Sequence, residues 1–210
     1  MKGIRLVSWD VDGTLFSHVR LLAPLIRQFA RCGMESGWRN SFERLHETWK
    51  FHRTVENQRQ APNSMVLASE LEPFENIYAL ERRALDKALQ TIRPRSRALA
   101  MLRRFSSDGV PQVALSDFEC DYKLKALGIR QYFDDTYSCH SLGFWKPSPT
   151  PFAKIQSDFR VRPDQHLHIG DRRDTDGEAC ARNGCRFMLI DQLPRPWKTF
   201  NRICAISAVE

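Results

Sequence analysis

Two carboxylates separated by one residue follow the first apolar run of this 210-residue chain. The run from Ile4 to Trp9 is typical of a buried parallel strand, and it would deliver Asp10 and Asp12 to the end of a sheet, where Gly13 allows a sharp turn. Two carboxylates in one small space repel each other, and an oxygen-preferring cation such as Mg²⁺ would relieve that repulsion. One carboxylate could then attack while the other transfers a proton. The simpler interpretation is an acidic turn after a strand, because Asp-Gly pairs are common in turns.

Further polar residues follow other predicted strands or lie in a loop between a strand and a helix. They are Ser116 and Asp117 after the run at 113–115, Lys146 in the loop at 143–149, and Asp171, Asp174 and Asp176 after the run at 165–169. In a parallel sheet the carboxyl ends of the strands lie at one edge, so we expect these groups to converge with Asp10 and Asp12.

Each of these groups also has a purely structural interpretation. Ser116 and Asp117 could cap the following helix. Lys146 could be an ordinary surface lysine. The acids from Asp171 to Asp176 could begin a helix, where the dipole favours negative charge. Their order along the chain and their shared position at strand ends favour a common site.

Together these residues resemble the four motifs of the haloacid dehalogenase-like (HAD) superfamily, in its phosphatase form. The motifs are Asp10-Val11-Asp12-Gly13-Thr14, Leu115-Ser116-Asp117, Lys146-Pro147-x-Pro149-x-x-Phe152 and Gly170-Asp171-x-x-x-x-Asp176. The resemblance covers residues 4–15 and 94–190. The residues between them stand where members of this superfamily carry a helical C1 cap.

The resemblance implies a role for each residue. Asp10 would be the nucleophile, Asp12 the general acid and base, and Lys146 the group that neutralises charge on Asp10 and the phosphoryl group. Mg²⁺ would be held by the Asp10 carboxylate, the Asp12 backbone carbonyl and Asp171, with Asp176 as a supporting group or an additional ligand. Substrate binding would involve Thr14, Ser116 and Asp117.

The reaction predicted in this way is Mg²⁺-dependent hydrolysis of a small phosphate monoester through an aspartyl-phosphate. The acid at Asp12 argues against a haloacid dehalogenase, which would not need one there. A sugar phosphomutase remains an alternative, because the phosphoryl group could pass to a sugar hydroxyl instead of water. A binding protein that retains the scaffold without activity is less favoured, because all the motif residues are present.

The elements that must position this site divide the chain into two parts. After residue 94, apolar strands alternate with helical segments, which predicts parallel β-α-β units and an α/β fold with a Rossmann-like parallel sheet. Residues 16–93 have helical periodicity with no strand signal, and we predict a bundle of four helices, the first ended by Gly33 and the last begun by Pro73. The predicted domains are therefore a core of residues 1–15 and 94–210 and a helical cap of residues 16–93.

Some residues depart from the patterns common in this superfamily. Ser17 and His18 stand where relatives often carry an Asp-Ser or Asp-Thr pair, and His18 could face the substrate or be a surface histidine. Arg172 and Arg173 follow Asp171 and could attract a second anionic group of the substrate or simply be solvated. Trp9 is expected to pack in the core. The cap residues Trp38, His46, Trp49 and His52 are also expected to pack internally rather than to contact substrate.

Composition limits the class of protein. A hydrophobic content of 42% predicts a folded core, and the net charge of +7 favours anionic partners such as phosphate esters. A nucleic-acid partner is compatible with this charge but not favoured, since the basic residues are dispersed. No secretory signal or membrane span is predicted, so we expect a cytoplasmic protein with reduced cysteines. The sequence makes no prediction of oligomeric state.

Overall fold

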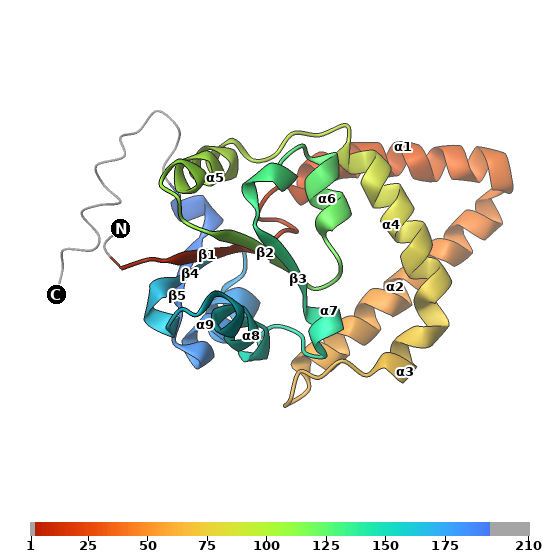
Figure 1. Ribbon diagram of the computed structural model, residues 1–210. Coiled ribbons are helices and arrows are strands. Elements are labelled where there is room, and N and C mark those ends of the chain that lie inside the picture. The colour runs from red at the N-terminus through yellow and green to blue at the C-terminus, as the bar shows by residue number, and fades with distance from the viewer. Residues whose placement is uncertain (1–2, 194–210) are drawn as a thin grey trace.

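A five-stranded parallel sheet forms the centre of the protein, with β1 in the middle and the strand order β3-β2-β1-β4-β5 (Figure 1). The computed structural model describes residues 3–193, apart from the side chains of residues 28, 32, 33, 35 and 36. The strands are β1 (Leu6–Trp9), β2 (Gln112–Ser116), β3 (Asp135–Ser138), β4 (His166–Gly170) and β5 (Arg186–Leu189). Each neighbouring pair is parallel. The predicted α/β fold with a Rossmann-like sheet is confirmed.

Helices cover both faces of the sheet. In Figure 1, α5 (Ser96–Ser107) and α6 (Asp121–Ala126) lie over one face, and α8 (Thr150–Phe159) and α9 (Glu178–Asn183) lie over the other. The short helix α7 (Cys139–Leu142) follows β3 directly. The remaining short elements are η2 (Arg130–Tyr132), η3 (Pro163–Gln165), the single π-helical turn η4 (Arg173–Gly177) and η5 (Ile190–Gln192).

All four residues of β1 are buried, because neighbouring strands flank β1 and helices cover both of its faces. This explains why its sequence lacks the polar alternation of a half-exposed strand. Trp9 packs edge-on against Phe105 of α5 with ring centroids 6.2 Å apart, and its indole N–H donates to Gln112 Oε1 at 3.1 Å. The expected packing role of Trp9 is confirmed.

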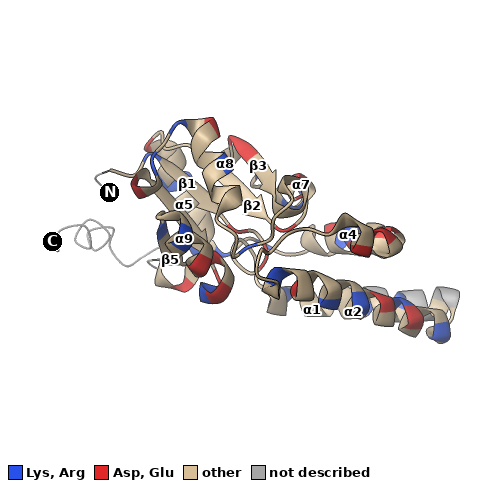
Figure 2. Ribbon diagram, turned by 90° about the horizontal axis from the view of Figure 1, so that it is seen from below, with Lys and Arg blue, Asp and Glu red and all other residues tan. Residues whose placement is uncertain are grey.

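A block of helices lies between β1 and α5, and we refer to residues 18–89 as the helical insert. It contains α1 (His18–Ser36), α2 (Trp38–Gln60), α3 (Ala68–Leu71), the 3-10 turn η1 (Glu72–Phe74) and α4 (Glu75–Leu89). Viewed from below, the insert projects from one end of the core, and acidic and basic residues are interspersed along it (Figure 2).

Several predicted helix boundaries in the insert are wrong. The first helix continues through Gly33 to Ser36, since an interior glycine weakens a helix by about 1 kcal/mol without ending it. The second runs to Gln60 and includes the first five residues of the polar segment 56–64, which lies between two predicted apolar helical stripes. Glu56 explains this extension, because it pairs with Arg59 and accepts from Gln60, which are helical-spacing contacts.

Boundaries elsewhere shift for similar local reasons. Pro73 lies in η1, so the fourth helix begins two residues later at Glu75. The first helix after residue 94 begins at Ser96. The helix after Asp176 begins at Glu178, because the π-helical turn η4 occupies the residues before it.

Internal packing of Trp38, His46, Trp49 and His52 was expected and is wrong. All four side chains are exposed, with Trp38 and Trp49 at 49% and 54%. The reason is the arrangement of α1, α2 and α4, which form a triangle in Figure 1 instead of a closed bundle. A pocket lies between these three helices and is lined by Leu25, Leu45 and Ile77 among others. Trp49 and His52 instead line the large cavity between the insert and the sheet.

Two predictions from composition can be compared with the structure. The described cysteines Cys120, Cys139, Cys180 and Cys185 are free thiols, as expected, while Cys204 and the side chain of Cys32 lie outside the described residues. Within residues 3–193, no helix combines the length and the apolar character that crossing a membrane requires.

Candidate active site

The carboxyl ends of β1, β2 and β4 open into one cavity of about 710 Å³ between the sheet and the helical insert. Six of the predicted residues line it, namely Asp10, Asp12, Asp117, Lys146, Asp171 and Asp176. The convergence expected from parallel strand ends is therefore present. The Thr14 hydroxyl donates to the Asp10 carboxylate, and the Ser116 hydroxyl donates to the Asp12 carboxylate.

Lys146 connects two of the acids at the centre of this site. Its ammonium lies 2.6 Å from Asp10 Oδ1 and 2.7 Å from Asp176 Oδ1, and its side chain is almost fully buried. The surface-lysine interpretation is wrong. The insert fixes the position of Trp145, the residue before Lys146. The Trp145 indole donates to Gln58 Oε1 at 3.0 Å, and the Trp145 backbone N–H donates to Ser64 O at 2.7 Å.

Asp10, Asp171 and Asp176 form a carboxylate cluster in which one oxygen from each residue lies within 4.8 Å of the other two. Thr14 orients the first of them by donating to Asp10 Oδ2 at 2.8 Å. Ligands on opposite sides of Mg²⁺ are roughly 4 Å apart, so this oxygen-only set fits that ion after a small adjustment.

The charges in this cluster also favour a cation. Burial raises the pKa of Asp10, Lys146 opposes that rise, and the carboxylates of Asp176 and Asp171 add to it. Burial and Asp176 likewise raise the pKa of Asp171. Burial opposes ionisation of Asp176 as well, but Lys146 and His168 outweigh it, so its pKa is lowered. One ammonium thus balances only part of the charge of three carboxylates, and a divalent cation would remove the remaining repulsion.

Two glycines allow these acids to approach so closely. Gly13 has φ = +87°, and a Cβ at this position would lie 2.0 Å from Asp171 Oδ2. A Cβ on Gly170 would lie 2.2 Å from Asp176 Oδ2. Any side chain at either position would displace a carboxylate of the cluster, which explains why both motifs require glycine.

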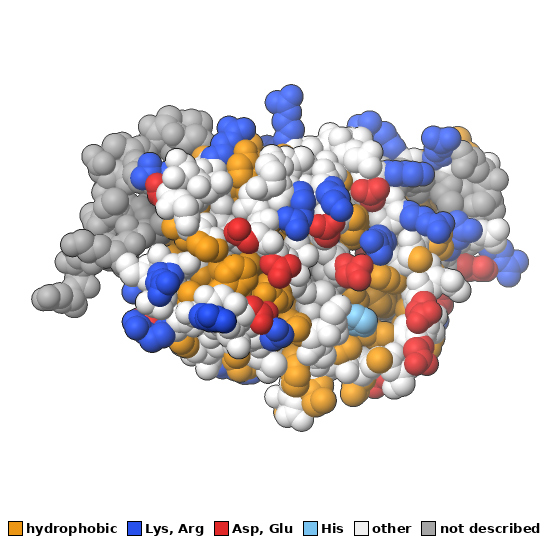
Figure 3. All heavy atoms as spheres, in the orientation of Figure 1, with side chains coloured by type: hydrophobic (Ala, Val, Ile, Leu, Met, Phe, Trp, Pro, Cys, Tyr) orange, Lys and Arg blue, Asp and Glu red, His pale blue; other side chains and the backbone are white. Residues whose placement is uncertain are grey.

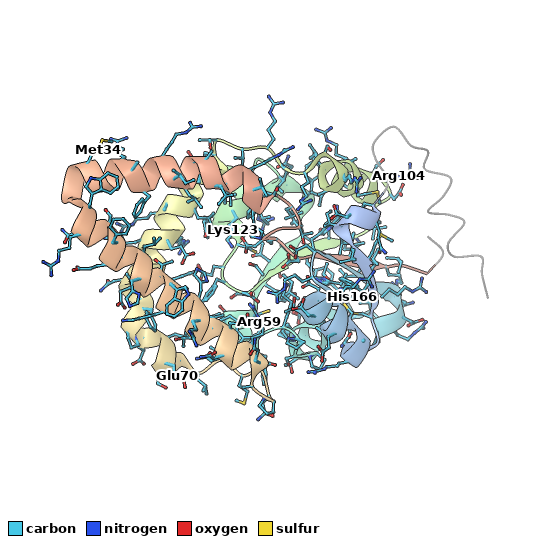
Figure 4. All side chains as sticks on the ribbon, turned by 180° about the vertical axis from the view of Figure 1, so that it is seen from behind. Met34, Arg59, Glu70, Arg104, Lys123 and His166 are labelled. Atoms are coloured by element: carbon cyan, nitrogen blue, oxygen red, sulfur yellow. The ribbon has the colours of Figure 1, made fainter. Side chains whose placement is uncertain are left out.

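Asp12 points toward a second cation rather than toward this cluster. Lys123 of α6 lies 2.5 Å from Asp12 Oδ2, and the Ser116 hydroxyl donates to the same oxygen at 3.1 Å. Burial opposes ionisation of Asp12, but Lys123 and Ser116 outweigh it and lower its pKa. Lys123 is buried where the insert meets the core (Figure 4), and sequence reasoning missed it because one lysine in a short helix has no distinguishing pattern.

Asp117 was expected to bind substrate, and the structure places it against the insert. Its Oδ2 accepts a hydrogen bond from Arg59 of α2 at 2.5 Å, and Arg59 also pairs with Glu56 at 2.6 Å. This ion pair joins the C-terminal part of α2, where Arg59 is labelled in Figure 4, to the residue that follows β2. Sequence reasoning did not identify Arg59, since its partner is 58 residues away.

The residues that depart from the superfamily patterns have different positions. His18 lines the cavity near the acids. Arg172 also lines the cavity, but Asp174 neutralises its guanidinium through contacts of 3.2 and 2.5 Å. Arg173 is exposed and does not line the cavity.

Comparison with known proteins agrees with this arrangement. The model of the haloacid dehalogenase-like hydrolase family matches residues 4–184, so the chain belongs to that family. A comparison with curated protein sequences finds no match.

Three solved structures show how widely this fold is shared. A HAD phosphatase from Thermococcus onnurineus superposes with a TM-score of 0.67 at 17% identity, covering 99% of each chain. A 2-haloacid dehalogenase from Pseudomonas syringae pv. Tomato superposes with a TM-score of 0.62 at 17% identity, covering 94% of this chain and 90% of the other. CbbY from Rhodobacter sphaeroides, in complex with xylulose-(1,5)bisphosphate, superposes with a TM-score of 0.61 at 20% identity. The superposition covers 89% of this chain and 85% of the other. These likenesses establish the fold, and the reaction must be argued from the residues of this chain.

Proposed function

We propose that this protein is a Mg²⁺-dependent phosphatase that hydrolyses a small phosphate monoester through an aspartyl-phosphate on Asp10. The observation that carries the proposal is the second carboxylate, Asp12, which lines the same cavity as Asp10 and has its own buried cation, Lys123. Displacement of a halide needs no such proton-transferring group, whereas an ester oxygen must be protonated as it leaves.

The carboxylates of Asp10 and Asp171, with the backbone carbonyl of Asp12, would hold the Mg²⁺ ion, and Asp176 would support them or supply a further ligand. When bound, this ion would neutralise charge on the phosphoryl oxygens and on the surrounding acids.

The side chains of this chain perform the two chemical steps. An Asp10 carboxylate oxygen attacks phosphorus, the bond from phosphorus to the ester oxygen breaks, and Asp12 gives its proton to the departing alkoxide. Water then attacks the phosphorus of the acyl phosphate, Asp12 takes the proton from that water, and phosphate leaves with Asp10 restored. Lys146 balances charge on Asp10 in both steps.

The protonation of Asp12 must change during this cycle. Lys123 favours the ionised form in the free protein, which is the form that accepts a proton from water. A phosphate dianion beside Asp12 raises its pKa, because like charges disfavour ionisation, so substrate binding would bring in the proton that the first step requires.

The cavity lining favours a substrate with a second anionic group. Arg53 of α2 and Arg82 of α4 line the cavity and lie over the rings of Trp49 and Tyr122 at 5.1 and 4.8 Å. Among the side chains that the structure describes, Arg53 has no carboxylate within ion-pair distance. Arg53→Ala should raise KM for a substrate with a phosphate and a second anion while leaving an aryl phosphate unchanged, and Lys50→Ala on the same helix serves as the control.

The first test of the proposal is a panel of phosphorylated metabolites and an aryl phosphate, assayed with Mg²⁺ and with chelator. Phosphate release should depend on Mg²⁺ and disappear in Asp10→Asn, while Asp164→Asn, an exposed acid outside the cavity, should retain activity. Such release would also exclude a silent binding protein. Full turnover in Asp10→Asn would remove Asp10 from the mechanism.

A sugar phosphomutase is the alternative that the same residues allow, because a sugar hydroxyl could replace water in the second step. The cavity of about 710 Å³ has room for more than a phosphate group, so a sugar phosphate would fit as a substrate. Product analysis separates the two reactions: a phosphatase releases inorganic phosphate, and a mutase returns an isomerised sugar phosphate. A polynucleotide substrate is less favoured, since acidic residues interrupt the basic ones on the face shown in Figure 3.

A further inference from the structure

A line of buried polar side chains crosses the middle of the sheet and ends at Asp176. It runs from Gln156 on α8 to His166 on β4, then to Ser8 on β1, and back to His168 on β4. The successive contacts are Gln156 Nε2 to His166 Nδ1 (3.2 Å), His166 Nε2 to Ser8 Oγ (2.7 Å), Ser8 Oγ to His168 Nδ1 (2.7 Å) and His168 Nε2 to Asp176 Oδ1 (3.3 Å). The proposed reaction uses none of the residues before Asp176.

The parallel register creates this line. Ser8 pairs with His168 and lies diagonally from His166, and strand alternation places all three on the face covered by α8 and α9. Each has an exposed fraction of 0%. Phe152 of α8 packs edge-on against His168 with ring centroids 4.9 Å apart, so the imidazole has little room to rotate.

The direction of every hydrogen bond in the line follows from its first member. The Gln156 amide nitrogen can only donate, so His166 Nδ1 must accept and its proton lies on Nε2. Ser8 Oγ accepts that proton and has one hydroxyl hydrogen left, which it donates to His168 Nδ1. His168 therefore carries its proton on Nε2, where the acceptor is the carboxylate of Asp176. All donors point toward the candidate active site.

We propose that Ser8, His166 and His168 are positioning residues for the catalytic centre. Asp176 Oδ1 receives both the His168 N–H and the Lys146 ammonium, so the line fixes the oxygen that holds Lys146 against Asp10 Oδ1. The catalytic consequence rests on the proposed phosphatase function, but the hydrogen-bond arrangement does not. Burial lowers the pKa of His166 to about 3, which agrees with the neutral ring that the arrangement requires.

Two substitutions of His168 separate positioning from packing. The amide of His168→Gln reaches as far as Nε2 and keeps the donor to Asp176, whereas the shorter amide of His168→Asn reaches only the Nδ1 position and loses it. Loss of a hydrogen bond that orients a catalytic or metal-binding side chain lowers activity roughly 10- to 100-fold. We therefore expect His168→Asn and Ser8→Ala to lower kcat by that factor with KM little changed, and His168→Gln to retain most of kcat.

The matched control is Gln112→Leu. Gln112 is also buried in the sheet and donates to two backbone carbonyls, at 2.9 and 3.2 Å, but it has no connection to Asp176. This variant should lower Tm about as much as Ser8→Ala while kcat stays at the wild-type value. Equal losses of kcat in Gln112→Leu and His168→Asn would overturn the positioning role.

A second measurement needs no substrate. With ¹⁵N-labelled histidine and lysine, NMR should show His166 and His168 as neutral Nε2–H tautomers, and the Lys146 ammonium resonance should shift in His168→Asn but not in His168→Gln. An Nδ1–H tautomer at either histidine, or an unmoved Lys146 resonance, would overturn the inference whatever the activity. If the NMR results are as expected but the protein hydrolyses no phosphate ester, the hydrogen-bond arrangement is supported and the proposed phosphatase function is wrong.

Discussion

Lys123 and Asp12 lie 111 residues apart in the sequence, and their side chains meet at 2.5 Å. The lysine belongs to α6, which packs against the sheet, so its position follows from the fold of the core. The lysine side chain is 6% exposed and the aspartate 34%. A buried ammonium beside this carboxylate favours its ionised form, and in the proposed mechanism that form accepts a proton from water.

Replacing Lys123 with Gln should therefore move the acid limb of the pH profile upward. In the proposed mechanism, Asp12 must be ionised to accept a proton from water, so hydrolysis of the aspartyl-phosphate should slow as pH drops through the pKa of Asp12. Lys123 lowers that pKa, and its removal should shift the limb by roughly one to three pH units toward neutrality. The measurement is the rate constant for hydrolysis of the aspartyl-phosphate against pH, in single-turnover experiments with an aryl phosphate. Lys125→Gln, which changes an exposed lysine of the same helix, is the control. If the acid limb does not shift in Lys123→Gln, Asp12 is not the group that accepts the proton from water.

Lys146→Met should destabilise the protein and make its stability depend on Mg²⁺. Without the ammonium, Asp10 and Asp176 are buried acids with no cation between them, a change that costs about 3–5 kcal/mol when one partner of a buried pair is removed. Mg²⁺ binding to the native state should recover part of this loss. Denaturant unfolding with Mg²⁺ or chelator measures the effect, and Lys154→Met is the exposed control. Wild-type stability in Lys146→Met would contradict the central role of this lysine.

The ion pair between Arg59 and Asp117 should stabilise the junction of α2 and β2. Only 12% of the Arg59 side chain is exposed, so the pair is less screened than a surface contact. Removing either partner should lower the free energy of unfolding by about 1–3 kcal/mol. A double-mutant cycle of Arg59→Met and Asp117→Asn measures their coupling, and Arg39→Met on the exposed part of α2 should have no measurable effect. A coupling energy near zero would mean that this contact does not hold the insert.

His166 should make the protein less stable in mild acid. Its pKa is about 3 in the folded state, because of burial and the nearby His168, and about 6.5 in an unfolded chain. The unfolded state thus binds more protons between these two values, and stability falls as pH drops through that window by up to about 1.4 kcal/mol per pH unit. Unfolding free energies at pH 6.5 and 5 should differ less in His166→Gln than in the wild type. If the wild type and His166→Gln show the same difference, groups other than His166 cause the loss of stability in acid.

The sequence predicts the core elements well because each has a local signal. Buried parallel strands read as short apolar runs, as Val113–Leu115 does, and a carboxylate directly after such a run can only lie at the sheet edge. Asp10 and Asp171 were predicted to share a site for this reason, whereas Lys146 lies in a loop and was assigned to the site through its resemblance to a superfamily motif. The insert was predicted less accurately, since the periodicity of Trp38, Phe42, Leu45 and Trp49 indicates a helix but does not show what its apolar face contacts.

The histidines of β4 illustrate a signal that was present but not used. The alternation His166-Leu167-His168 places two imidazoles on one face of a strand otherwise expected to be fully apolar. Buried polar groups need partners. Two of them at adjacent same-face positions indicate a polar line through the sheet, although the partner Ser8 is 158 residues from His166.

The amino-acid sequence by itself determined the type of fold, the order of its strands and helices in the chain, and the set of acids and the lysine at the strand ends. Those features depend on local hydrophobic pattern and on short motifs, which act over a few residues. Only the tertiary structure decided that Lys123 pairs with Asp12, that Arg59 pairs with Asp117, and that Ser8 connects His166 to His168. These contacts depend on strand register and on how helices pack, and such long-range geometry leaves no local pattern in the chain.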